Sequence, residues 1–156
     1  MDILIVLEDS NSNIHRMGLE SITGAQHLAS SIGLQASAVV MGANANALAD
    51  EASQFDLNEV IKINDDLLST YSSDGYAEAL KQIIDNESPS YILFGHSYQV
   101  RDYVPKLSAK LMKPFLADSI ALKIDGQTVS ATKQMFNAKL FSDVSPSTDT
   151  PYLISF

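Results

Sequence analysis

The residues most suggestive of chemistry lie where the apolar run Tyr91–Phe94 meets Gly95-His96-Ser97. A serine between a strand and a helix is typical of the nucleophile elbow of serine hydrolases, whose motif is G-x-S-x-G. Here Gln99 stands in place of the last glycine, and no histidine follows Ser97, although that fold supplies its histidine after the serine. We therefore expect a tight turn rather than a catalytic serine.

Other patterns for catalysis and metal binding are equally weak. The chain has no cysteine, and its three histidines (His15, His27 and His96) are too far apart in sequence for the paired-histidine zinc motif. Neither the G-x-x-x-x-G-K-[ST] loop nor the G-x-G-x-x-G loop for phosphate occurs. We therefore expect no catalytic residue and no metal ligand in this chain.

Composition narrows the class of protein. A length of 156 residues with 46% apolar residues suits one folded domain. The net charge of −9 argues against unaided binding to nucleic acid or to an anionic membrane. The N-terminus lacks the features of a secretory signal, and no apolar run is long enough for membrane insertion. We expect a cytoplasmic protein, or a mitochondrial matrix protein in a eukaryote.

Short apolar runs alternate with segments of helical period up to about residue 112. Strands are expected at residues 3–7, 36–41, 60–63 and 91–94, each followed by a helix. The fourth helix should begin near Arg101 or Asp102, which places Pro105 in its first turn, where a missing amide costs least. The alternation predicts an α/β fold, with a three-layer Rossmann-like parallel sheet covered by helices on both faces.

The remainder of the chain changes to a period of about two. Further strands are expected at residues 119–124, 128–132, 135–141 and 152–156, with a polar loop at residues 142–150. Asp125-Gly126 signals a hairpin between the first two of these strands. We expect the C-terminal strands to be added at one edge of the sheet, some of them antiparallel.

The turns at residues 8–13, 42–46 and 95–101 should meet at one edge of the sheet, because each follows a parallel strand. Ligands of open parallel sheets bind at that edge, where the strand order reverses. The candidate ligand residues are the small turn residues and the one cation at this edge near a helix N-terminus: Gly42, Gly95, His96, Ser97 and Arg101. The alternatives are that Gly42 only makes a turn and that Arg101 pairs with Asp102, contacts a partner or faces solvent.

In order along the chain, these segments resemble the N-terminal domain of the electron transfer flavoprotein α subunit. Residues 91–122 resemble the family's strand, small polar turn, Gly-Arg-Asp and Pro-Arg-hydrophobic helix, with Arg101, Asp102 and Pro105 on that pattern. Residues 133–140, KQMFNAKL, resemble its Arg-Pro-x-Tyr-Gly-Gly-Lys/Asn-Leu hairpin. The sequence departs from the family where Val100, Gln134, Asn137 and Ala138 replace glycine, proline and the paired glycines.

The resemblance implies a role without catalysis. Residues 1–156 would be the scaffold and docking domain of a heterodimeric, FAD-dependent electron carrier. That carrier links flavin dehydrogenases, including those of fatty acid β-oxidation, to the respiratory chain. The implied partner is the β subunit, and FAD would be held mainly by a C-terminal domain absent from this chain, so residues 1–156 should bind no cofactor. The implied fold is like that of the adenine nucleotide alpha hydrolases, and the alternative function is a free-standing adenine-nucleotide-binding domain.

A docking domain should expose an apolar surface when it is alone. Met135, Phe136, Leu140 and Phe141 are the residues we expect to form it. In that case the isolated chain would self-associate. The alternative is that these side chains form the core of the added strands.

Overall fold

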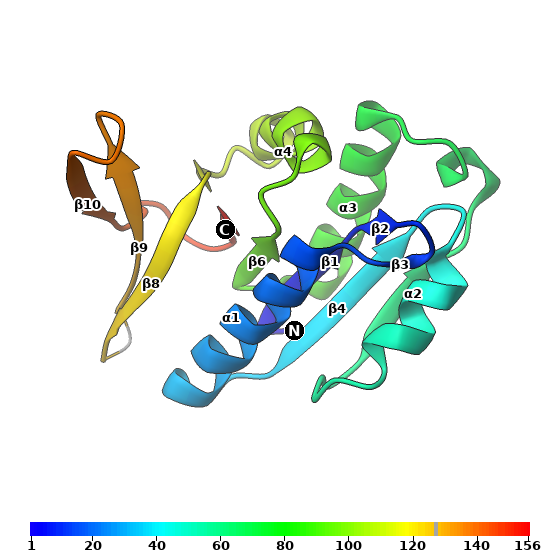
Figure 1. Ribbon diagram of the computed structural model, residues 1–156, viewed down its shortest axis with the longest axis horizontal. Coiled ribbons are helices and arrows are strands. Elements are labelled where there is room, and N and C mark those ends of the chain that lie inside the picture. The colour runs from blue at the N-terminus through cyan, green and yellow to red at the C-terminus, as the bar shows by residue number, and fades with distance from the viewer. Residues whose placement is uncertain (127) are drawn as a thin grey trace.

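The fold is centred on a six-stranded parallel sheet, seen in a computed structural model that describes residues 1–126 and 128–156. The strand order is β5-β4-β1-β6-β11-β7, and every neighbouring pair is parallel (Figure 1). The strands are β1 Ile3–Leu7, β4 Ala36–Met41, β5 Val60–Ile63, β6 Tyr91–Phe94, β7 Phe115–Leu116 and β11 Tyr152–Ser155. The predicted α/β class with a Rossmann-like parallel sheet is confirmed.

Helices cover both faces of this sheet, which makes three layers (Figure 1). The helices are α1 Arg16–Ile32, α2 Ala45–Ala52, α3 Ser73–Glu87 and α4 Tyr98–Leu111, with a short 3₁₀ helix, η1, at Asp66–Leu68. Alternate side chains of β1 enter two separate cores, one shared with α1 and α2 and the other with α3 and α4. Because both faces are covered, every residue of β1, β4 and β6 is buried.

Three antiparallel strands form a second sheet beside the body of the molecule, which we call the arm (Figure 1). They are β8 Ser119–Asp125, β9 Thr128–Met135 and β10 Leu140–Val144. Val129 and Ala131 on the inner side of β9 are buried in the core that includes α1. The arm lies between β7 and β11 in the chain, so the last strand returns to the parallel sheet and pairs with β6 and β7. A small hairpin, β2 Asp9–Ser10 with β3 Asn13–Ile14, occupies the predicted loop after β1.

The predicted start of the fourth helix is wrong. Helix α4 begins at Tyr98, because the Ser97 side chain caps it by accepting a hydrogen bond from the Val100 N–H at 3.1 Å. Pro105 therefore lies inside the helix, where it leaves the Arg101 carbonyl without its usual intrahelical donor. Its ring is on the exposed side of the helix, so the helix accommodates it without distorting the core.

The predicted strand at residues 135–141 is also wrong. Phe136, Asn137 and Ala138 all have positive φ, so the chain turns there between β9 and β10. The hairpin between β8 and β9 is confirmed, although Asp125 belongs to the strand and pairs with Thr128. Residue 127 lies outside the described residues. None of the helices that the structure describes is long and apolar enough to cross a membrane.

Candidate functional site

The predicted ligand edge exists as an arrangement of backbone. Glu8, Gly42 and Gly95 directly follow β1, β4 and β6, which are adjacent in the sheet. The strand order reverses between β1 and β6, because the chain places β4 and β5 on one side of β1 and β6 on the other. The side chains at this point decide whether a ligand has room.

Ser97 bridges the point where the strand order reverses. Its hydroxyl donates to Glu8 Oε1 at 2.8 Å, and its oxygen accepts from the Val100 N–H. The hydroxyl proton is thus directed to a carboxylate, and the oxygen is directed to the helix. Ser97 caps a helix and ties β1 to α4, which is the behaviour expected of a turn residue and not of a nucleophile.

Gly95 is a contact point between β6 and α1. A Cβ added to Gly95 would lie 2.6 Å from Met17 Cβ and 2.8 Å from the Met17 carbonyl carbon. These distances are shorter than real Cβ contacts, and one of them is to backbone, which cannot swing away. Gly95 therefore allows α1 to approach the sheet closely, and Met17 occupies the position that a side chain would take.

Gly42 lies in a small acidic cavity of about 160 Å³ at the ends of β1 and β4. Glu8, Asp9, Tyr71 and Tyr76 line it. The φ of Gly42 is 100°, a backbone conformation that strains any residue with a side chain. In addition, a Cβ there would lie 2.7 Å from the Tyr76 hydroxyl, which would have to move. Pockets for organic ligands are usually about 300–1,000 Å³. A smaller cavity lined by carboxylates is unsuited to a nucleotide phosphate.

The Glu8 carboxyl is shifted in its pKa because the side chain is largely buried at the end of β1. Burial raises the pKa of its carboxyl, and the hydrogen bond from Ser97 opposes that effect. The folded state therefore binds this proton more tightly than the unfolded state does. The resulting stabilisation is fully present below the ordinary pKa of the glutamate and is lost as pH rises through the folded-state pKa.

We expect Glu8→Gln to become increasingly stabilising, relative to the natural chain, as pH rises from 4 to 8. Glutamine retains an oxygen that can accept from Ser97, but it carries no buried charge. Thermal unfolding at several pH values measures the difference in Tm. Glu59→Gln, which removes a carboxylate at an exposed position, is the matched control. A Glu8→Gln difference that stays constant from pH 4 to 8 would contradict the assignment.

His96 and Arg101 lie on another side of the edge, in what we call the basic crevice. This cavity of about 440 Å³ is bounded by α4, β7 and the arm, and Lys133 and Gln134 of β9 line it together with His96 and Arg101. His96 Nδ1 lies 2.8 Å from Ser155 Oγ, which fixes the imidazole against β11. The structure therefore does not bring the five predicted ligand residues together. Gly42 lines the acidic cavity, and His96 and Arg101 line the basic crevice. Gly95 allows close packing of α1, and Ser97 caps α4.

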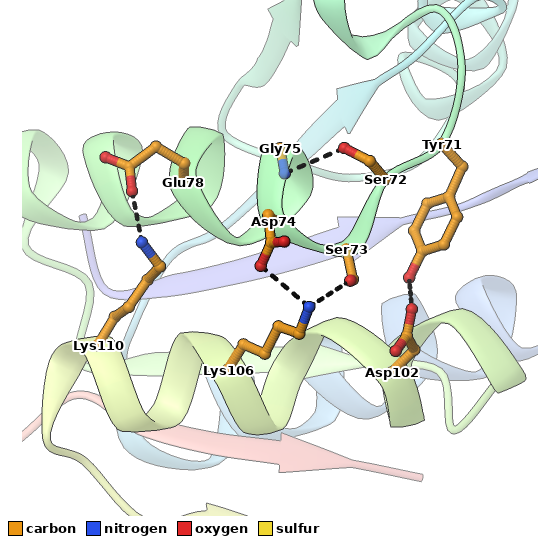
Figure 2. Close-up of polar contacts among 9 residues, drawn as sticks. All are labelled: Tyr71, Ser72, Ser73, Asp74, Gly75, Glu78, Asp102, Lys106 and Lys110. Atoms are coloured by element: carbon orange, nitrogen blue, oxygen red, sulfur yellow. Dashed lines mark hydrogen bonds and ion pairs between the residues drawn. The ribbon is translucent and has the colours of Figure 1, made fainter.

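Arg101 does not pair with Asp102. The Tyr71 hydroxyl donates to Asp102 at 2.7 Å, and this contact belongs to a row of polar contacts between α3 and α4 (Figure 2). In the same row Lys106 binds Asp74 at 2.9 Å, and Lys110 binds Glu78 at 2.8 Å. The Arg101 guanidinium instead lies 5.6 Å from the centre of the Tyr98 ring, a cation–π geometry.

The four apolar residues expected at the surface are exposed at the end of the arm, which we call the arm tip. The exposed fractions are 42% for Met135, 71% for Phe136, 58% for Leu140 and 63% for Phe141. Met135 pairs with Leu140, whereas Phe141 pairs with Gln134, so the apolar side chains lie on both faces. The exposure is confirmed, and the alternative of a core inside the added strands is wrong.

Lys133 is a residue that sequence reasoning missed. It follows Val129 and Ala131 at intervals of two, so its side chain is on the inner face of β9, where the arm meets the body. That alternation was the available signal, but it does not say which part of the body the strand faces. Within residues 1–126 and 128–156, no group of three or more side chains is arranged to hold a metal ion.

Comparisons with known proteins give the family. Residues 3–156 match the model of the electron transfer flavoprotein domain. The electron transfer flavoprotein subunit alpha of Bacillus subtilis is 31% identical over 106 residues, or 68% of this chain and 33% of that protein. Its counterpart in Thermoanaerobacterium thermosaccharolyticum is 29% identical over 144 residues, or 92% of this chain and 44% of that protein.

A third relative, the alpha subunit of Clostridium acetobutylicum, is 23% identical over 153 residues, which is 97% of this chain and 46% of that protein. The chain thus spans less than half the length of these relatives. The similarity covers the sheet, the helices and the arm, which is the extent over which the sequence resembled the α subunit. That resemblance is confirmed, and the chain belongs to the electron transfer flavoprotein domain family.

Proposed function

We propose that this chain is the scaffold and docking domain of an electron transfer flavoprotein α subunit, and that its arm tip packs on the β subunit. The observation that carries the proposal is the set of four large apolar side chains exposed at one end of a three-stranded arm. Solvent-exposed apolar residues gathered in this way are typical of protein interfaces. The arm is held to the body by its inner face, so the tip is presented on a fixed support.

In this proposal the chain has no catalytic step of its own. It would belong to a heterodimer that carries electrons from flavin dehydrogenases to the respiratory chain, in the cytoplasm or the mitochondrial matrix. FAD would be bound mainly by a second domain of the α subunit. The filled ligand edge supports this division of work, because Met17 and Tyr76 occupy the space next to the two edge glycines.

The alternative function, an adenine-nucleotide-binding domain, is not favoured by the acidic cavity at the ends of β1 and β4. The cavity there has about 160 Å³, and Glu8 and Asp9 line it. A phosphate would meet carboxylates where a nucleotide site needs donors.

The docking proposal predicts that Phe141→Ser weakens binding to an electron transfer flavoprotein β subunit by about tenfold or more, because central aromatic residues dominate interface energies. Titration calorimetry with a purified β subunit measures this loss. Leu67→Ser is the matched control, since Leu67 is 84% exposed on η1, away from the arm. Equal affinities for both variants would contradict docking through the arm tip.

The same surface predicts self-association of the isolated chain, measured by sedimentation velocity over a range of concentrations. Phe141→Ser should reduce it while circular dichroism remains unchanged. The purified chain should also lack flavin absorbance. A yellow complex with stoichiometric FAD would overturn the proposed division between the two domains.

A further inference from the structure

Some of the lysine and arginine side chains of this protein form ion pairs or hydrogen bonds, and others form neither. The chain carries 19 acidic and 10 basic side chains, so acidic side chains outnumber the cations. Within the part of the chain that the structure describes, Arg16, Lys81, Lys106, Lys110 and Lys123 make ion pairs. Lys62 and Lys113 bind oxygen atoms of Asn46 and Asp149. Arg101, Lys133 and Lys139 make neither kind of contact there, and the first two line the basic crevice.

Arg101 and Lys133 reach the crevice from different elements. Arg101 is in the first turn of α4, Lys133 is on the inner face of β9, and His96 lines the same crevice. Burial lowers the pKa of His96, and the charges of Arg101 and Lys133 lower it further, while that of Asp118 opposes them. Both cations therefore act on the same small region, where they oppose protonation of the imidazole.

The rest of the crevice provides apolar surface and space. Phe115 and Pro105 on the body and Met135 on the arm line it beside the two cations. Its volume of about 440 Å³ is within the usual range for sites of small organic ligands. A charged end and an apolar wall in one cavity suit a ligand that has both characters.

We propose that the basic crevice binds the phosphate group of a small organic phosphate. The guanidinium of Arg101 offers a planar fork of donors, Lys133 adds a point charge, and two cations match a phosphate dianion better than a single carboxylate. The organic part of the ligand packs on Phe115, Pro105 and Met135. This site is separate from the acidic cavity at the ends of β1 and β4, and it does not rest on the docking function.

Titration calorimetry of the whole 156-residue chain with inorganic pyrophosphate, AMP and adenosine tests the proposal. Arg101→Gln and Lys133→Gln should each weaken binding of the two phosphates by about tenfold or more. Lys139→Gln is the matched control, because it removes the same charge from an unpaired lysine that does not line the crevice. Tighter binding of AMP than of pyrophosphate would show that the apolar wall contributes to affinity. Equal affinity of the two would show that the crevice recognises the phosphate alone.

A substitution that should strengthen phosphate binding makes the test sharper. Asp118 lines the crevice with φ at 55°, a conformation that asparagine accepts, so Asp118→Asn should tighten phosphate binding several-fold. Asp50→Asn, at an exposed position of α2, should not. The His96 ring resonance in NMR spectra should shift on addition of AMP, and those of His15 and His27 should not. Equal losses in Lys139→Gln, adenosine binding as tightly as AMP, or dissociation constants above about 1 mM for both phosphates would overturn the proposal.

Discussion

Replacing Gly95 with alanine is expected to lower the free energy of unfolding by about 1–3 kcal/mol, the usual cost of overpacking a core. The added Cβ would lie 2.6 Å from Met17 Cβ and 2.8 Å from its carbonyl carbon, so α1 must move away from the sheet. That movement loosens the core that Ile22, Ala25 and Leu28 of α1 share with β1. Chemical denaturation followed by circular dichroism measures the change.

Gly24→Ala is the control, because it makes the same chemical change within α1. A Cβ on Gly24 would lie 3.6 Å from the nearest atom of Phe156, which is an ordinary contact. Removing a glycine from a helix interior should stabilise the protein by about 0.5–1 kcal/mol. Unchanged stability in Gly95→Ala would mean that α1 does not approach β6 closely, and it would restore Gly95 as a position open to a ligand.

Most of the fold could be predicted from local patterns. The first three strands and the helices after them have uniform periods, and each boundary has its own turn residues, so local preference and tertiary packing agree. The fourth helix begins three or four residues before its predicted start, because Ser97 caps it at a point that the position of Pro105 does not indicate. The turn at Phe136, Asn137 and Ala138 was predicted as strand, because no glycine or proline marks the positive φ angles there.

The candidate site was predictable only in part, for a physical reason. Topology places the ends of β1, β4 and β6 together, so Gly42, Gly95 and Ser97 were found from the order of the elements. Whether that edge is open depends on side chains from distant elements, such as Met17 on α1 and Tyr76 on α3. No periodicity in one sequence specifies these contacts between distant segments. The same holds for Lys133, which reaches the crevice through the way the arm packs on the body.

Tyr103→Phe is expected to raise the free energy of unfolding by about 1–3 kcal/mol, the cost of an unsatisfied buried polar group. The Tyr103 side chain is fully buried, and its hydroxyl has no hydrogen-bond partner among the described residues. Burial raises the pKa of this hydroxyl well above its ordinary value, so it stays neutral. Phenylalanine keeps the ring contacts with Tyr76 and Phe94, at centroid distances of 5.9 and 6.2 Å, and removes only the oxygen.

Tyr71→Phe makes the same chemical change nearby, but it should lower the free energy of unfolding. Its hydroxyl donates to Asp102, so its removal should cost about 0.5–1.5 kcal/mol (Figure 2). The two measurements together separate the effect of the oxygen from the effect of losing a tyrosine. Destabilisation by both variants would show that the Tyr103 hydroxyl has a buried partner such as a bound water. Opposite signs would show that the core beside the acidic cavity keeps a polar group that destabilises the folded state.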